Sequence, residues 1–152
     1  MFADEEIPLI AQDGVWKYSD DGTDLGTAWR EPNFDDSAWP SGPAGLGFGN
    51  RGILTTLDRG PSTARNVTFY FRKAFNVTSA QLNSLEGDDP FYQILLGLQR
   101  DDGAVIYING KELYRDNMPT GEITWSTLAT SSAGGTSAVS YTHLRAHETA
   151  RH

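Results

Sequence analysis

Aspartate clusters on expected turns are the first residues of this chain whose type and spacing could do chemistry. The candidate ligands of a cation are Asp20, Asp21, Asp24, Asp101 and Asp102. Calcium takes oxygen ligands from flexible loops, so these carboxylates predict a structural calcium site, and calcium is the cofactor that the sequence indicates. The string from Asp20 to Asp24 lacks the full pattern of an EF-hand calcium loop. A solvated turn, in which the carboxylates accept bonds from backbone N–H groups, is the alternative that we favour.

Adjacent carboxylates must also be weighed as a pair for glycoside hydrolysis. The pairs are Asp35-Asp36 and Asp101-Asp102. A glycosidase needs two carboxyl groups about 5–10 Å apart, one of them with a raised pKa. Neighbours in sequence usually point apart, and turn aspartates more often bond backbone N–H groups. The chain has no cysteine, its 3 histidines all lie at its end, and it carries no nucleophile motif, so we predict that it is not an enzyme by itself.

Tryptophan and arginine offer a candidate carbohydrate-binding pair. A flat apolar ring can stack on the C–H groups of a sugar, and a guanidinium can donate to its hydroxyls. Trp29 and Arg30 lie in a stretch that we expect to be a loop, so they are the candidate carbohydrate-binding residues. Packing is the alternative for Trp29. Trp16 and Trp39 stand among core-like residues, and for them we expect core packing.

The last part of the chain differs from the rest. Residues 139–149 read VSYTHLRAHET and resemble the translation of an adapter used in preparing DNA libraries, which implies a metagenomic source. His143 and His147 have a spacing that could hold zinc on one helix face, but the string H-E-x-x-x-H does not match a zincin motif. We therefore expect residues 131–152 to be a disordered linker followed by a non-biological tail.

Charge and composition restrict the partners. The 152 residues carry a net charge of −8, with lysine and arginine scattered rather than gathered in a stripe. This disfavours nucleic acid and anionic lipid as partners. No apolar run reaches the roughly 18 residues of a membrane span, so we expect no membrane insertion. The 16 glycines and the lack of a long helical period favour an all-β domain with many turns.

The stretch from Phe91 to Arg115 organises the predicted sheet. Asn109-Gly110 lies between apolar segments, and both residue types tolerate the positive φ of a type I′ turn, so they are predicted structural turn residues. Asp101-Asp102-Gly103 predicts a second turn. The three segments are therefore expected to be adjacent antiparallel strands. Residues 104–108 are apolar on both alternating sets, which predicts a central strand covered on both faces.

Further elements are expected on either side of this stretch. A bulge or a switch of the strand to another sheet is expected near Arg72-Lys73, because Lys73 interrupts an apolar face. A short helical turn is predicted at 79–85, and residues 51–66 are expected to form a long exposed loop. Additional strands are predicted at 15–18, 67–77 and 122–128.

Four phrases of the sequence point together to one family. They are Trp16-Lys17-Tyr18, Phe34-Asp35-Asp36-Ser37-Ala38-Trp39, Tyr70-Phe71-Arg72-Lys73-Ala74-Phe75 and Val105-Ile106-Tyr107-Ile108-Asn109-Gly110. Together they resemble the galactose-binding-like jelly-roll module of large secreted bacterial proteins. The resemblance implies an all-β, two-sheet antiparallel β-sandwich over residues 9–130, preceded by a lead-in at 1–8. The family's closing strands are missing here, so the sandwich is expected to be incomplete at its C-terminus.

The same resemblance implies a role. The expected function is that of a non-catalytic accessory module in a secreted multidomain protein, outside the cell or at its surface. Its expected partner is a carbohydrate or a neighbouring domain of the same polypeptide. Two alternatives stay open. The chain could be the sugar-binding sandwich domain of a larger glycoside hydrolase or phosphoesterase, or a structural spacer without a ligand.

Overall fold

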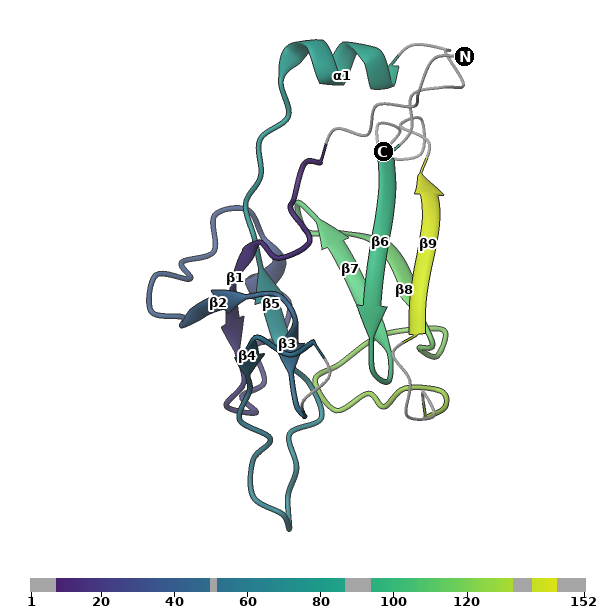
Figure 1. Cartoon of the computed structure of the whole chain (residues 1–152). Helices are drawn as coiled ribbons and strands as arrows, with labels where there is room; N and C mark the ends of the chain where they lie inside the picture. Colours follow the sequence, from purple (N-terminus) through teal and green to yellow (C-terminus); the bar gives the residue numbers. More distant parts are fainter. Residues whose placement is uncertain (1–7, 50–51, 87–93, 133–137, 145–152) are drawn as a thin grey trace. The chain divides into compact units, whose positions relative to one another are not determined.

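The structure, a computed structural model, describes residues 8–49, 52–86, 94–132 and 138–144, and Figure 1 labels its elements. Residues 1–7 of the expected lead-in and residues 145–152 of the expected tail lie outside the described residues. The helical elements are the 3-10 turn η1 (Ala28–Arg30) and helix α1 (Ser79–Glu86). The strands are β1 (Val15–Ser19), β2 (Ser41–Pro43), β3 (Leu46–Gly47), β4 (Thr55–Thr56), β5 (Tyr70–Arg72), β6 (Ile94–Arg100), β7 (Ala104–Ile108), β8 (Lys111–Asp116) and β9 (Ala138–Leu144).

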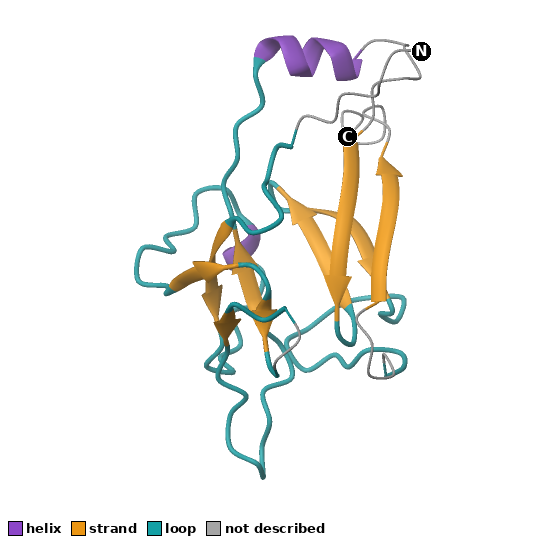
Figure 2. Cartoon of the chain, in the orientation of Figure 1, coloured by secondary structure: helices purple, strands orange, loops and turns teal. Residues whose placement is uncertain are grey.

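Strands predominate over helix in the described part of the chain, as Figure 2 shows. The expectation of a mostly-β protein is therefore confirmed. Helix α1 confirms the helical turn predicted at 79–85, and its start has a local cause. The backbone N–H of Gln81 donates to the Thr78 hydroxyl at 3.2 Å, while the side chain of Gln81 accepts from the backbone N–H of Thr78 at 2.8 Å. This reciprocal pair is a capping box, which satisfies two N–H groups of the first turn.

The chain divides into two compact units. The first contains the described residues up to Leu25 together with Asp35–Val77. The second contains Gly26–Phe34 and the described residues from Thr78 onward. Each unit has its own strands, so each is described by itself.

In the first unit, β1 is the centre of an antiparallel sheet of order β2-β1-β5. Its middle residue Lys17 is opposite Ser41 on one side and Arg72 on the other. Strand β1 confirms the strand predicted at 15–18. A second, smaller sheet joins β3 and β4 in parallel, with Leu46 opposite Thr55.

Two predicted segments of the first unit differ from the structure. The strand predicted at 67–77 is reduced to β5, which ends where Lys73 turns its ammonium back to the carbonyl of Val15 at 2.8 Å. The loop predicted at 51–66 contains β4 and is tied at its far end. There the side-chain amide of Asn66 donates to the carbonyls of Asp20 at 2.7 Å and Asp58 at 3.2 Å.

The apolar core of the described residues is small. Leu57 is 6% exposed and Tyr70 is 5% exposed, and burial raises the pKa of the Tyr70 phenol. Gly42 in β2 is also buried, and Thr55 packs directly over it. The Thr55 hydroxyl donates to the carbonyl of Pro43 at 2.8 Å, which fixes the threonine in place. The two small sheets of this unit therefore meet where a side chain on residue 42 would not fit.

Replacing Gly42 with alanine is expected to destabilise the first unit. An added Cβ would lie 2.3 Å from the Thr55 hydroxyl oxygen and 2.7 Å from its methyl group, so the threonine must move and lose its bond to Pro43. Overpacking of this kind costs about 1–3 kcal/mol. The measurement is thermal unfolding, with Gly49→Ala as the control because nothing lies within 4 Å of an added Cβ there. Gly49 has a φ of 89°, so its alanine variant reports backbone strain without overpacking. A Gly42→Ala variant that melts at the temperature of the parent would contradict the packing argument.

In the second unit, β7 and β8 form the predicted hairpin. Asn109 has a φ of 49° and Gly110 a φ of 82°, the two consecutive positive values that a type I′ turn requires. The predicted structural turn at Asn109-Gly110 is therefore confirmed. The ladder runs from Ile108 opposite Lys111 to Ala104 opposite Asp116, with an irregularity next to Ile106.

The expected pairing of β6 with β7 is wrong. The sequence predicts that β6 pairs with β7, but β6 pairs with β9 along its whole length. In the described residues β7 pairs with β8 alone, and all of its residues are half-buried rather than covered on both faces. The prediction of a central strand at 104–108 is therefore also wrong. An apolar pattern of period two identifies a strand but does not determine which strand pairs with it.

Two other predictions differ from the structure in the second unit. Residues 138–144, expected within a disordered segment, form β9. Residues 122–128, expected to be a strand, instead contain a turn in which the Thr127 backbone N–H donates to the carbonyl of Thr124 at 3.1 Å. The hydroxyl of Thr127 also accepts from the backbone N–H of Thr124 at 2.9 Å. Threonine hydroxyls that satisfy nearby backbone groups compete with strand pairing.

Candidate functional site

Trp29 and Arg30, the candidate carbohydrate-binding residues, lie on η1 of the second unit and meet on the same tyrosine. The Trp29 ring contacts Tyr107 edge to face, with centroids 5.7 Å apart and an interplanar angle of 87°. The Arg30 guanidinium carbon lies 4.5 Å from the centre of the same ring, a cation–π distance. Both side chains are half-buried. The packing role that was the alternative for Trp29 is thus present, and Tyr107 is a partner that sequence reasoning did not single out.

The aspartates at the end of β1 accept hydrogen bonds from loops of the first unit. One Asp20 carboxylate oxygen accepts from the backbone N–H of Asp58 at 2.7 Å. Asp21 accepts from the backbone N–H of Thr23 at 3.0 Å and from the Ser19 hydroxyl at 3.4 Å. The bond from the Thr23 N–H is the main cause that holds the pKa of Asp21 below its ordinary value. These contacts are those of turn aspartates.

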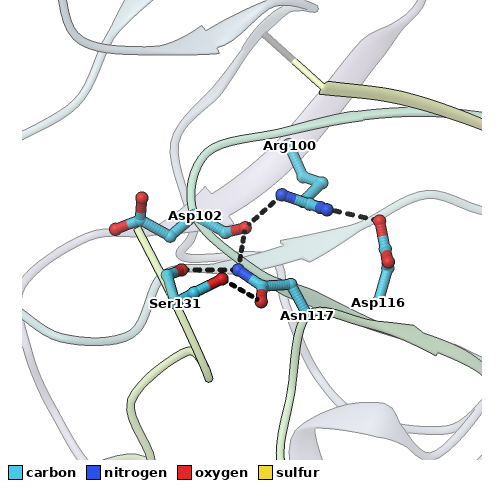
Figure 3. A network of polar contacts seen from close by, with 5 residues as sticks. All are labelled: Arg100, Asp102, Asp116, Asn117 and Ser131. Carbon is cyan, nitrogen blue, oxygen red and sulfur yellow. Dashed lines mark hydrogen bonds and ion pairs between the residues drawn. The ribbon is translucent and has the colours of Figure 1, made fainter. Parts of the chain in front are cut away.

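Asp101 and Asp102 lie in the second unit, in the connection between β6 and β7. Figure 3 shows the contacts of Asp102. The carbonyl of Asp102 accepts from the Arg100 guanidinium at 2.6 Å and from the Asn117 amide at 3.1 Å. Arg100 also forms an ion pair with Asp116 at 2.7 Å. Desolvation, then the neighbouring Asp102, raises the pKa of Asp101. The bonds from Arg100 and Asn117 both end on the backbone carbonyl of Asp102, so they stabilise this turn through its main chain.

The candidate calcium ligands are divided between the two units. Asp20, Asp21 and Asp24 belong to the first unit, and Asp101 and Asp102 belong to the second. Within the described ranges, no group of three or more His, Asp or Glu residues is placed to hold a metal ion. Calcium binding stays a prediction from the sequence.

The Asp35-Asp36 pair is split between two structural tasks. Asp35 accepts from the backbone N–H of Ser37 at 3.0 Å and so closes the turn before Trp39. Asp36 forms ion pairs with Lys17 at 3.0 Å and Arg72 at 2.8 Å. The hydrogen bond from Arg72 is the largest cause that lowers the pKa of Asp36, and Lys17 adds to it. Both contacts agree with the expectation that adjacent turn carboxylates point apart and serve the fold.

An open concavity of about 400 Å³ lies beside the end of β1 in the first unit. Two aromatic residues, Tyr18 and Trp39, line it together with the acids Asp20 and Asp21. Its remaining lining residues are Ser19, Thr23, Leu25, Ala38 and Pro40. Sequence reasoning assigned Trp39 to the core and Asp20 and Asp21 to a turn. It missed their juxtaposition, because residues 18–25 and 38–40 meet only through tertiary structure.

Comparison with known proteins finds no match. No protein-family model, curated protein or solved structure matches the chain. Within the described residues, no helix has the length and apolar character needed to cross a membrane. The residues thus define a β-rich chain with small sheets, and any function must be argued from the concavities and side chains themselves.

Proposed function

We propose that this chain is a non-catalytic carbohydrate-binding module of the galactose-binding-like, jelly-roll class, part of a larger secreted protein. The observation that carries the proposal is the concavity lined by Tyr18, Trp39, Asp20 and Asp21. Ligand sites are concave and combine apolar walls with a few polar groups that fix orientation. An aromatic wall beside carboxylates is the combination that suits a sugar, which has apolar C–H faces and a rim of hydroxyls.

Each lining group has a matching part of a sugar. The rings of Tyr18 and Trp39 offer apolar surface for the C–H face, and Tyr18 adds a hydroxyl. The carboxylate of Asp21 accepts from hydroxyl groups, and charge-assisted bonds of this kind are stronger than neutral ones. Because the pKa of Asp21 is lowered, this carboxylate keeps its charge below the ordinary pKa of 3.8. The proposed acceptor is therefore ionised throughout the neutral and mildly acidic range.

The open shape of the concavity sets the expected strength of binding. A ligand that keeps one side in water buries only part of its surface, and the loss of its translational freedom opposes binding. We expect a Kd on the order of 1 mM for a monosaccharide, which corresponds to roughly −4 kcal/mol. Weak single sites of this kind gain strength when linked modules bind one polymer, which suits an accessory module in a multidomain protein.

The test is a titration of the full chain with neutral mono- and oligosaccharides, followed by amide chemical shifts. We expect saturable shifts at Tyr18, Asp21 and Trp39. Asp21→Asn removes a charged acceptor, so the affinity should fall about tenfold. Asp24→Asn is the matched control, because it removes the same charge from a residue that does not line the concavity. The affinity of Asp24→Asn should stay within about twofold of the parent.

The outcomes separate the proposal from its alternatives. Trp39→Phe keeps an aromatic wall and should keep measurable binding, which distinguishes a lost contact from a lost fold. Shifts confined to Trp29 and Arg30 would move carbohydrate binding to the second unit and contradict the concavity as its place. An absence of saturable shifts with every sugar would favour a structural spacer.

A further inference from the structure

A second concavity of the first unit, of about 310 Å³, has a different character from the first. Three of its lining residues are cations, Lys17, Arg72 and Lys73, and one is an anion, Asp36. The surplus of positive charge is local, because the whole chain has a net charge of −8. The other lining residues are Val15, Trp16, Ser41 and Ala74.

The register of the sheet creates this cluster. Lys17 on β1 is directly opposite Arg72 on β5 and directly opposite Ser41 on β2. Residues opposite each other in an antiparallel ladder lie on the same face, and like charges placed so are destabilising. The Asp36 carboxylate relieves this repulsion, with one oxygen 3.0 Å from the Lys17 ammonium and the other 2.8 Å from Arg72.

Lys73 brings a further cation that Asp36 does not neutralise. Its ammonium donates to the carbonyl of Val15 at 2.8 Å. An ammonium has three donors, so this bond leaves donor capacity for a ligand. Among the described residues, Lys73 forms no ion pair with a carboxylate, whereas Lys17 and Arg72 both do. Asp35, which precedes Asp36 in the sequence, already accepts from the backbone N–H of Ser37.

We propose that this concavity binds a small oxyanion, such as the carboxylate or sulfate group of an acidic sugar, with the Lys73 ammonium as its main contact. Lys17 contributes the second cation, and the Ser41 hydroxyl in the same row contributes a neutral donor. Ammonium and hydroxyl donors suit the acceptor oxygens of an oxyanion. The proposal is independent of the neutral-sugar concavity, because the two sets of lining residues do not overlap.

The net negative charge of the chain determines how anion binding at this site depends on salt. A net negative protein repels an anion at long range, but salt screens that repulsion beyond about 8 Å at physiological ionic strength. Binding therefore depends on the contacts inside the concavity. It should weaken as sodium chloride is raised, because exposed charge pairs are screened.

The experiment compares sodium glucuronate, sodium sulfate and glucose as probes of the full chain, at an ionic strength held constant with sodium chloride. Amide shifts report binding, and we expect saturable shifts at Lys17, Ser41 and Lys73 with glucuronate and sulfate but not with glucose. Lys73→Met keeps the apolar stem and removes the charge, and it should weaken binding about fivefold. Lys111→Met in the second unit is the control for net charge, and its affinity should stay within about 1.5-fold of the parent.

Each result decides one point. Binding of both glucuronate and sulfate that depends on Lys73 supports a general oxyanion site, and Lys73-dependent binding of glucuronate alone supports an acidic sugar as its source. Lys73→Arg keeps the charge and should retain binding, which separates loss of charge from loss of fold. Anion binding that is unchanged in Lys73→Met, or equalled by added chloride, would overturn the proposal. Asp21→Asn should leave anion binding unchanged, so failure of the neutral-sugar site does not affect this test.

Discussion

Replacing Asn117 with alanine should lower the free energy of unfolding of the second unit by about 2 kcal/mol. Asn117 has a φ of 53°, a left-handed conformation that asparagine tolerates better than alanine. Its amide also donates to the carbonyls of Asp102 at 3.1 Å and Ser131 at 2.6 Å, and its side-chain oxygen accepts from the Ser131 hydroxyl at 2.9 Å (Figure 3). Alanine loses these bonds and strains the backbone.

The position of Asn117 in the chain explains why one residue matters this much. It follows directly after β8, and its side chain joins the connection between β6 and β7 to the segment at residue 131. Its own carbonyl accepts from the backbone N–H of Thr130 at 2.9 Å, which adds a main-chain tie to the same segment. Three stretches far apart in sequence are thus held together by one amide side chain.

Asn117→Gly is the matched control for this prediction. Glycine accepts the positive φ without strain but makes none of the side-chain bonds, so it isolates the contribution of the network. We expect the glycine variant to lose about 1 kcal/mol, roughly half of the loss in the alanine variant. Chemical denaturation followed by the fluorescence of Trp29 and Trp125, both in the second unit, measures the two values. A glycine variant as unstable as the alanine variant would show that the left-handed conformation contributes little.

The features that the sequence predicts well are those with a local cause. Asn109 and Gly110 carry their own conformational preference, so the type I′ turn and the β7–β8 hairpin follow from two adjacent residues. The capping box of Thr78 and Gln81 is local in the same way. Elements set by neighbouring side chains can therefore be read without knowledge of the rest of the fold.

The features that the sequence does not predict depend on pairing between distant segments. The ladder between β6 and β9 joins Ile94–Arg100 to Ala138–Leu144, and neither strand carries a signal that names the other. The candidate sites have the same cause. In the sequence, Lys17 and Arg72 are two scattered cations, and only the register of the ladder places them opposite each other. Trp39 lines the same concavity as Asp21 because the turn closed by Asp35 precedes it. The spacing of residues in the sequence does not predict these arrangements, because they depend on which strands pair and in which register.

Replacing Asp36 with asparagine should destabilise the first unit by about 1–3 kcal/mol, the second large effect that the structure predicts. The substitution keeps the shape of the side chain but leaves Lys17 and Arg72 opposed across the ladder without an anion between them. The side chains of Asp36 and Arg72 are 25% and 16% exposed, so water screens the pair less than on an open surface. Lys17 is 38% exposed, which keeps its share smaller.

The ion pairs of Asp36 should also make the stability of the chain depend on pH. The pKa of Asp36 is lowered in the folded chain from its ordinary value of 3.8, mainly by the hydrogen bond from Arg72. A carboxylate of this kind contributes its stability above the unfolded pKa and loses it as the pH falls through the folded pKa. The parent should therefore lose stability below about pH 4, and Asp36→Asn should lose less over that interval. Parallel acid-unfolding curves for the two chains would contradict the role given to Asp36.

The same variant connects stability to the proposed oxyanion site. Removing the Asp36 charge raises the surplus of positive charge among Lys17, Arg72 and Lys73, so an added oxyanion should bind more tightly while the free chain is less stable. Sulfate should then raise the melting temperature of Asp36→Asn more than that of the parent, because a ligand that binds only the folded state stabilises it. Asp35→Asn removes an equal charge one residue away, from a carboxylate bonded to Ser37 rather than to the cations, and it serves as the control. If Asp36→Asn lowers the stability of the free chain and raises its affinity for sulfate, the Asp36 carboxylate and the bound oxyanion interact with the same cations. Equal stabilisation of Asp36→Asn and the parent by sulfate would contradict this.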